Sequence, residues 1–156
     1  MLQEHVRIVE FDSRYAKDFA RLNYQWIEEF FEVESHDREV LDAPEEQIIQ
    51  NGGQILFAVH RGEVVGTVAL VPYGDDAFEL AKMAVFPGYK GQKIGKRLML
   101  RALDYAIQVG KKRVVIVSNT LLVTAINLYL QFGFKPIALA PDEDYERVNI
   151  KLEKKL

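Results

Sequence analysis

Three strand-like runs, joined by very short turns, lead directly into a helical pattern at the centre of this sequence. The runs cover residues 54–60 (QILFAVH), 64–73 (VVGTVALVPY) and 77–86 (AFELAKMAVF), and the turns between them read RGE and GDD. Turns this short, each with a glycine, predict two antiparallel β-hairpins. The apolar period then becomes helical, in a stripe ending at Gly110 that consists of Ile94, Leu98, Ala102, Tyr105, Ala106 and Val109.

Further periodic segments flank this centre on both sides. Those before it are a strand at 5–10, a helix at 15–31, a polar stretch, and a short helix after Pro44. Those after it are a strand at 113–118, a helix with the stripe Leu122, Ala125, Ile126 and Tyr129, and strands at 134–138 and 147–153. No repeat, linker or low-complexity segment interrupts this order, so we expect one mixed α/β domain over residues 1–156.

The composition excludes several kinds of protein. With 49% hydrophobic and 28% charged residues the chain is typical of a soluble globular protein, and its net charge of -3 disfavours general nucleic-acid binding. It has no cysteine, which rules out disulfides, thiolate metal sites and a cysteine nucleophile. The three histidines, His5, His36 and His60, show no metal-ligand spacing. No apolar run approaches a membrane span. We therefore expect a cytoplasmic protein with no metal, nucleic-acid or membrane partner.

The loop between the third strand and the helix concentrates glycine and positive charge. Gly91 and Gly95 stand beside three lysines, Lys90, Lys93 and Lys96. Glycine permits a positive φ and a close approach of a ligand to the backbone, and the free N–H groups of a helix start attract an anion. The pattern predicts a phosphate or pyrophosphate site. The alternative is a solvated, lysine-rich loop that only caps the helix.

Two common nucleotide-binding loops do not fit this spacing. A Walker A loop has four residues between its glycines and then Lys-Ser/Thr. Here three residues separate Gly91 from Gly95, and Arg97 stands where the hydroxyl would be. The Gly-x-Gly-x-x-Gly pattern of dinucleotide-binding domains is also absent. A phosphate-loop nucleotide binder is therefore disfavoured.

The sequence from Phe78 to Pro136 resembles the GCN5-related N-acetyltransferase (GNAT) family. VFPGYKGQKIGKRL matches the family pattern V-x-P-x-x-R-G-x-G-I-G-x-x-L, with lysine at positions 90 and 93. SNTLLVTAINLYLQFGF resembles the family's second signature, a helix that ends in Leu-Tyr before Gly-Phe. The resemblance implies a central, mixed, mostly antiparallel sheet flanked by about four helices.

The resemblance also implies a cosubstrate. Family members bind acetyl-coenzyme A with its pyrophosphate on this loop, and they transfer the acetyl group to a primary amine by direct attack in a ternary complex. A backbone N–H near Ala84 or Val85 would stabilise the oxyanion. The residues expected to bind the coenzyme are Met83, Ala84, Val85, Lys90, Gly91, Gln92, Lys93, Ile94, Gly95, Lys96 and Asn119.

Two residues are candidates for the proton transfers. Tyr129 matches the tyrosine that family members use as general acid, although its spacing alone, in an apolar stripe, favours a core residue. Glu79 is the candidate base, because strand alternation places it on one face with Ala81, Met83 and Val85, where an apolar setting would raise a carboxyl pKa. The alternative for Glu79 is a strand-end glutamate that faces solvent.

The acceptor amine has a candidate site near the first helix. The segment from 24 to 46 carries nine acidic residues and one basic residue, interleaved with aromatic side chains. Such a surface attracts a cationic amine, but it also fits a solvated helix face. The candidate acceptor-binding residues are Trp26, Glu29, Phe30, Tyr145 and Arg147. The family resemblance suggests a homodimer, and a non-catalytic acyl-CoA sensor is the alternative function.

Overall fold

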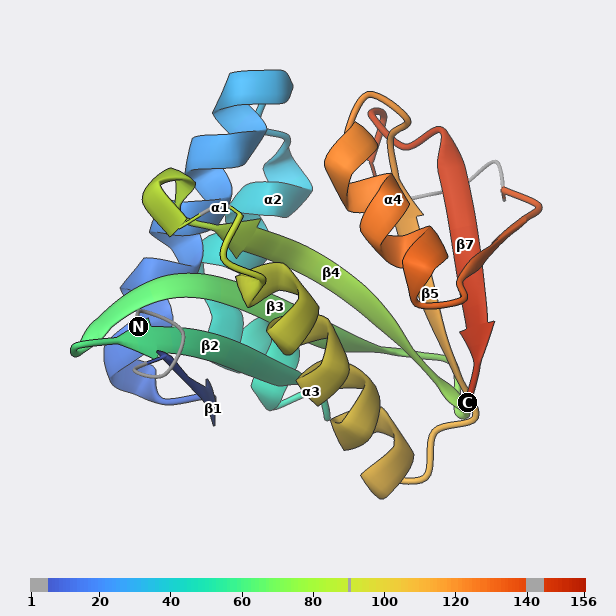
Figure 1. Cartoon of the computed structure of the whole chain (residues 1–156), viewed down its shortest axis with the longest axis horizontal. Coiled ribbons are helices and arrows are strands. Elements are labelled where there is room, and N and C mark those ends of the chain that lie inside the picture. Colours follow the sequence, from blue (N-terminus) through green and yellow to red (C-terminus); the bar gives the residue numbers. More distant parts are fainter. Residues whose placement is uncertain (1–5, 90, 140–144) are drawn as a thin grey trace.

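A seven-stranded sheet forms the framework of the protein (Figure 1). The computed structural model describes residues 6–89, 91–139 and 145–156. The strand order is β1-β2-β3-β4-β5-β7-β6, and every neighbouring pair is antiparallel except β4 and β5, which are parallel. The strands are β1 (Val6–Glu10), β2 (Gln54–His60), β3 (Glu63–Tyr73), β4 (Ala77–Val85), β5 (Arg113–Ser118), β6 (Lys135–Ile137) and β7 (Ile150–Lys155).

Helices cover both faces of this sheet (Figure 1). The described residues form α1 (Ala16–Phe30), α2 (Ser35–Asp42), α3 (Ile94–Gln108) and α4 (Val123–Gln131), with short helical turns η2 (Ser13–Tyr15), η3 (Glu45–Ile49) and η4 (Pro87–Tyr89). α1 and α2 pack on one face and α3 and α4 on the other. The predicted hairpins and the mixed, mostly antiparallel sheet are confirmed.

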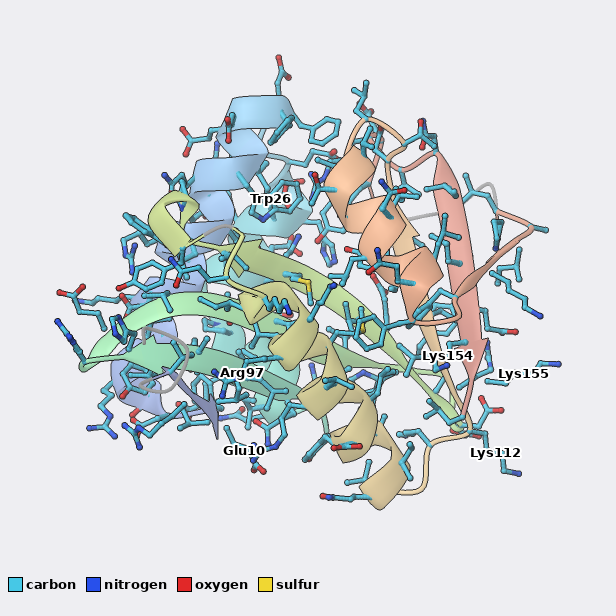
Figure 2. All side chains as sticks on the ribbon, viewed as in Figure 1. Glu10, Trp26, Arg97, Lys112, Lys154 and Lys155 are labelled. Carbon is cyan, nitrogen blue, oxygen red and sulfur yellow. The ribbon has the colours of Figure 1, made fainter. Side chains whose placement is uncertain are left out.

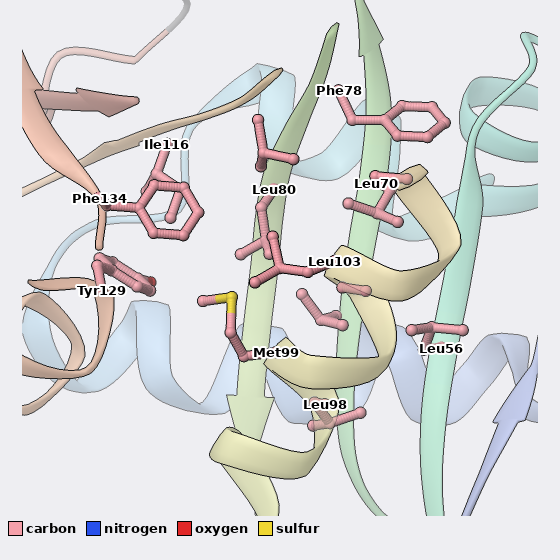
Figure 3. Packing of buried hydrophobic residues seen from close by; sticks show 14 of the residues in the cluster. Leu56, Leu70, Phe78, Leu80, Leu98, Met99, Leu103, Ile116, Tyr129 and Phe134 are labelled. Carbon is pink, nitrogen blue, oxygen red and sulfur yellow. The ribbon is translucent and has the colours of Figure 1, made fainter. Parts of the chain in front are cut away.

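Each face has its own apolar core. On the α3 face, one buried cluster contains Leu70, Leu80, Leu98, Met99 and Phe134 (Figure 3). The core of the α1 face is made by Phe19, Leu22, Ile27, Leu41, Ile48, Ile55, Phe57 and their neighbours. Because both faces bury apolar side chains, the central strands β2 and β3 are almost continuously hydrophobic.

One element was not predicted. Helix α2 (Ser35–Asp42) occupies the polar stretch in which no helical periodicity was found. It begins with a capping box, in which the Asp37 side chain accepts a 2.8 Å hydrogen bond from the Glu34 N–H and the Glu34 side chain accepts one in return. Its only fully buried apolar side chain is Leu41. An eight-residue helix with so little apolar surface has almost no periodic signal.

A β-bulge at Lys82 overturns the predicted face of Glu79. Lys82 has φ 54°, and the pairing with β3 slips by one residue at this point. Glu79 lies opposite Val71, which packs on the α1 face, whereas Met83 and Val85 pack on the α3 face. Plain alternation therefore fails, and Glu79 does not share a face with Met83 and Val85.

β4 and β5 separate soon after they pair. Their parallel ladder has three rungs and ends at Glu79 and Val115. β4 then continues to Val85 and β5 to Ser118 without further pairing between them. The result is a split in the middle of the sheet that opens between α4 and the end of α1 (Figure 1).

Candidate functional site

The glycine loop, residues 91–95, leads into the start of α3, where backbone N–H donors are exposed. Gly91 has φ 83° and Lys93, at the N-cap position, has φ 63° without any side-chain capping bond. The first amide to bond back into the helix is that of Arg97, which donates to the Lys93 carbonyl at 3.1 Å. Among the described residues, the amides of residues 94–96 have no backbone partner within the helix, as is usual for a helix start. Lys93 also explains the missing middle glycine, since it adopts the left-handed backbone that glycine would supply.

Close packing fixes where this helix begins. A Cβ on Gly66 of β3 would lie 3.0 Å from Ile94 Cγ2 and 3.1 Å from Leu98 Cδ1, so the helix rests directly on the strand backbone. A Cβ on Gly95 would meet only Leu128 of α4, at an ordinary 3.6 Å. Gly95 thus faces the space between α3 and α4.

The cations near this loop divide into two groups. Lys93 and Lys96 are exposed beside the amides of the helix start. Arg97 instead donates from Nη2 to the Val6 carbonyl at 2.9 Å and ties α3 to β1 (Figure 2). Lys90 lies outside the described residues. Gln92 is half-buried in the loop.

The open edge of β4 supplies further backbone donors. The Phe86 amide donates to the Val65 carbonyl at 2.8 Å, toward β3. Because successive N–H groups of a strand point to opposite edges, the amide of Ala84 also points toward β3 and the amides of Met83 and Val85 point into the split. Of the two expected oxyanion donors, the geometry favours Val85.

Tyr129 lies on the α3 face of the split. Its side chain is 7% exposed, its ring lies 6.2 Å from that of Phe134, and it points toward Met99 (Figure 3). Burial raises the pKa of Tyr129 to about 12, so the phenol is protonated at neutral pH. Among the described residues its hydroxyl has no hydrogen-bond partner. Tyr129 is therefore a core residue whose donor is still available.

Glu79 lies where the split between β4 and β5 begins, on the α1 face of the sheet. It belongs to the last rung between β4 and β5 and is half-buried on the α1 side of the sheet. Tyr129 and Glu79 therefore lie on opposite faces of the sheet.

A buried ion cluster, which we call the Asp37 cluster (Asp37, Lys82, Arg147), lies beside the split on the α1 face. Asp37 Oδ1 lies 2.7 Å from Lys82 Nζ, and Arg147 binds the same carboxylate in bidentate fashion at 2.7 and 2.8 Å. The Asp37 side chain is fully buried. Burial alone would raise the pKa of Asp37, but the hydrogen bonds from Arg147 and Lys82 outweigh it and hold that pKa well below its usual range.

Aromatic side chains surround this cluster. The Tyr145 hydroxyl accepts a 2.9 Å hydrogen bond from Lys82 Nζ, and Lys82 Nζ and Arg147 Cζ each lie 4.3 Å from the Tyr145 ring centroid. The Arg147 guanidinium is also 5.9 Å from the ring of Trp26 (Figure 2). Three predicted acceptor residues, Trp26, Tyr145 and Arg147, are therefore brought together.

The remaining predicted residues lie apart from these. Glu29 and Phe30 are exposed near the end of α1. Asn119 follows β5, and its side-chain amide donates to the Arg147 carbonyl at 2.6 Å while its oxygen accepts from the Leu121 amide at 2.8 Å. Asn119 therefore holds a loop, and its contact with pantetheine stays a prediction.

Sequence reasoning missed Asp37 and Lys82. One signal was present for Lys82, a lysine in the middle of the otherwise apolar strand FELAKMAV, where a buried cation needs a partner. Nothing in the sequence names Asp37 as that partner, because the two residues are 45 positions apart.

Within residues 6–89, 91–139 and 145–156, no helix is long and apolar enough to cross a membrane. Within the same residues, no group of three or more histidine, aspartate or glutamate side chains is placed to hold a metal ion.

Known proteins resemble this chain in sequence and in fold. The profile of the acetyltransferase (GNAT) family matches residues 20–134. An uncharacterized N-acetyltransferase of Escherichia coli, YjgM, is 34% identical over 98 residues, which is 60% of this chain and 59% of that protein. The match thus spans somewhat less than two thirds of this relative's length.

Two solved structures share the architecture over nearly the whole chain. A GNAT-family acetyltransferase from Staphylococcus aureus superposes with a TM-score of 0.87 at 20% identity, covering 96% of this chain and 98% of the other. The acetyltransferase yncA from Salmonella typhimurium, solved with its cofactor acetyl-CoA, gives a TM-score of 0.77 at 20% identity, covering 97% and 94%. With the family profile matching most of its length, the chain belongs to the acetyltransferase (GNAT) family.

Proposed function

We propose that this protein is an N-acetyltransferase that transfers an acetyl group from acetyl-CoA to a primary amine of a small molecule or peptide. The observation that carries the proposal is the uncapped start of α3 beside the unpaired edge of β4. The start of α3 supplies N–H donors for a diphosphate, and the edge of β4 supplies N–H donors for an extended pantetheine arm. The acetyl-CoA complex of the Salmonella protein, which has the same fold, supports the choice of cosubstrate.

The residues present suit the coenzyme. Amides of residues 94–96 would hold the diphosphate, and the exposed ammonium groups of Lys93 and Lys96 would add charge. The amides of Met83 and Val85 would pair with the pantetheine arm and the thioester carbonyl in the split. Gly95 leaves open the side of α3 that faces α4. The coenzyme supplies the activated acetyl group.

The acetyl transfer is a single substitution. The neutral amine attacks the thioester carbonyl carbon, a C–N bond forms, and the C–S bond breaks. The Val85 N–H would stabilise the charge that develops on the carbonyl oxygen. Glu79, on the α1 face, would take up the proton that the amine must lose.

Tyr129, on the α3 face, would donate a proton to the leaving sulfur. A free thiol has a pKa of about 8.5, whereas burial raises that of Tyr129 to about 12. Proton transfer to a solvated thiolate would therefore be uphill. A thiolate in the same apolar setting also has a raised pKa, so Tyr129 first donates a hydrogen bond and then the proton as the C–S bond breaks.

A binding and turnover experiment tests the proposal. Thermal unfolding is measured with acetyl-CoA, ATP and NAD, and release of free thiol from acetyl-CoA is measured with polyamines, amino acids, aminoglycosides and peptide N-termini. A ligand at about 100 times its Kd stabilises the native state by about 2.7 kcal/mol. We expect that stabilisation from acetyl-CoA and amine-dependent thiol release. Stabilisation by ATP alone would refute the proposal.

The acceptor, the homodimer, the cytoplasmic location and the single domain over residues 1–156 stay predictions. The acidic segment at the end of α1 favours a cationic acceptor. Arg147 is engaged by Asp37 and Glu34, so a carboxylate on the acceptor would have to compete with two protein carboxylates for it.

A further inference from the structure

The segment Tyr145–Asn149, which we call the strap, crosses the split between β4 and β5. At one end the Tyr145 hydroxyl accepts from Lys82 of β4. At the other end the Asn149 amide donates to the Ser118 carbonyl of β5 at 2.9 Å, and Asn119 holds the Arg147 carbonyl. The strap is therefore attached to both strands beyond the point where they stop pairing with each other.

Helix α2 anchors the middle of the strap. Asp37 binds Arg147 through both carboxylate oxygens, and Glu34 accepts from the Glu146 amide at 3.1 Å and from Arg147 at 3.3 Å. The Arg147 side chain is only 11% exposed. Bidentate, buried pairs of this kind fix orientation as well as distance.

Lys82 links this anchor to the strand that lines the split. It is the bulge residue of β4, with a left-handed backbone that a lysine adopts only when its surroundings hold it there. Its ammonium group is held by Asp37 and Tyr145. The next residue, Met83, directs its amide into the split. Because Asp37 binds both Lys82 and Arg147, one buried carboxylate holds the bulge and the strap.

We propose that Asp37, Lys82 and Arg147 are positioning residues that hold the strap in place as the acceptor-side wall of the split. The strap lies on the face of α1 and α2, with the Tyr145 ring 5.0 Å from that of His36. This places it opposite α3 and α4, between which the coenzyme is expected. The assignment of the strap to an acceptor site rests on the proposed function. Whether the three residues hold the strap in place can be measured without any enzymatic activity.

The strap carries two reporters. The amides of Glu146 and Asn149 are hydrogen-bonded and so are protected from hydrogen exchange. Trp26, the single tryptophan of the chain, lies beside Arg147. Amide exchange of residues 145–149 and acrylamide quenching of tryptophan fluorescence therefore report on the strap directly.

Four variants are compared with the wild type: Asp37→Asn, Lys82→Met, the conservative Lys82→Arg and, as a matched lysine control, the exposed Lys112→Met at the far corner of the sheet (Figure 2). We expect exchange of residues 145–149 to become about ten- to a hundred-fold faster in the first two, as expected for the loss of a charge-assisted hydrogen bond. Quenching of Trp26 should also rise in both. Lys112→Met should match the wild type, and Lys82→Arg should restore most of the protection.

Three results decide the proposal. Faster exchange confined to the strap supports it. Unchanged exchange there, or equal acceleration over the whole sheet, overturns it, because the ions would then serve only the general stability of the core. If Asp37→Asn does not fold, Lys82→Met and Lys82→Arg give the same decision. Where an amine substrate is found, its KM should rise at least about ten-fold in Lys82→Met, with acetyl-CoA binding unchanged.

Discussion

A negative charge introduced at residue 95 should stabilise α3 but weaken the binding of a diphosphate. Gly95 lies in the first turn of the helix, and a side chain there would point toward the space before α4, with only Leu128 in ordinary contact. Three replacements probe this position: Gly95→Ala adds a methyl group, Gly95→Gln adds length, and Gly95→Glu adds length and a negative charge. Gln and Glu are nearly equal in shape, so their difference isolates the charge.

The two effects of Gly95→Glu have opposite signs. Replacing a helical glycine by a good helix former gains up to about 1 kcal/mol, and a carboxylate in the first turn gains about 0.3–1 kcal/mol more from the helix dipole. For a chain of this size a gain of 1 kcal/mol raises Tm by about 2–4 °C. The same carboxylate near a diphosphate charge at about 5 Å is repelled by about 1–3 kcal/mol, between the water and near-surface limits. That is about 5- to 150-fold weaker binding.

Calorimetric titration with acetyl-CoA, together with thermal unfolding, measures both effects. We expect Gly95→Glu to unfold at a higher temperature than the wild type yet bind acetyl-CoA much more weakly than Gly95→Gln. The difference between the two should shrink with added salt. Gly95→Ala should bind almost normally. If Gly95→Glu is stable and binds acetyl-CoA as tightly as Gly95→Gln, the diphosphate does not lie at this helix start.

Four further predictions concern catalysis, packing and pH. Tyr129→Phe should lower amine-dependent thiol release at least about ten-fold while acetyl-CoA binding persists; undiminished release at all pH values would remove Tyr129 from the mechanism. Gly66→Ala should cost about 1–3 kcal/mol in denaturant unfolding, because its Cβ would press on Ile94 and Leu98; an unchanged midpoint would contradict the close packing. Asp37→Ala should cost about 3–5 kcal/mol, since it leaves Lys82 buried without its carboxylate; a loss below about 1 kcal/mol would show that the cluster contributes little. The pKa of Asp37 is lower in the folded than in the unfolded state, so its contribution is complete above the unfolded value of about 3.9 and is lost as pH falls toward the folded value; stability curves below pH about 4 should be steeper for the wild type than for Asp37→Asn.

The parts of the fold that local patterns determine were predictable. The β2–β3 and β3–β4 hairpins carry their own turn glycines, Gly62 and Gly74, both with positive φ. Helix α3 has an apolar stripe along most of its length. In each case the signal lies within a few residues of the element it predicts.

The parts that depend on distant contacts were not predictable. The bulge at Lys82 reversed the face expected for Glu79, because its left-handed backbone is held by Asp37, 45 residues away. Helix α2 begins with a polar capping box and buries little apolar surface, so periodicity missed it.

The candidate site also has a part with local sequence signals and a part that depends on distant contacts. The glycine loop and Tyr129 belong to motifs that are contiguous in sequence, and the structure places both beside the split. The proposed acceptor side comprises α1, α2, β4 and the strap, and of its members the sequence analysis named Trp26, Tyr145 and Arg147, whose role stays a prediction. The carboxylate that joins them, Asp37, had no local signal because its role exists only after the chain has folded.

A crystal structure of the protein with acetyl-CoA bound tests the central claim most directly. We predict diphosphate oxygens within hydrogen-bonding distance of the amides of residues 94–96, and the thioester oxygen at the Val85 N–H between β4 and β5. A diphosphate bound away from the start of α3, or a thioester that lies outside the split between β4 and β5, would contradict the account.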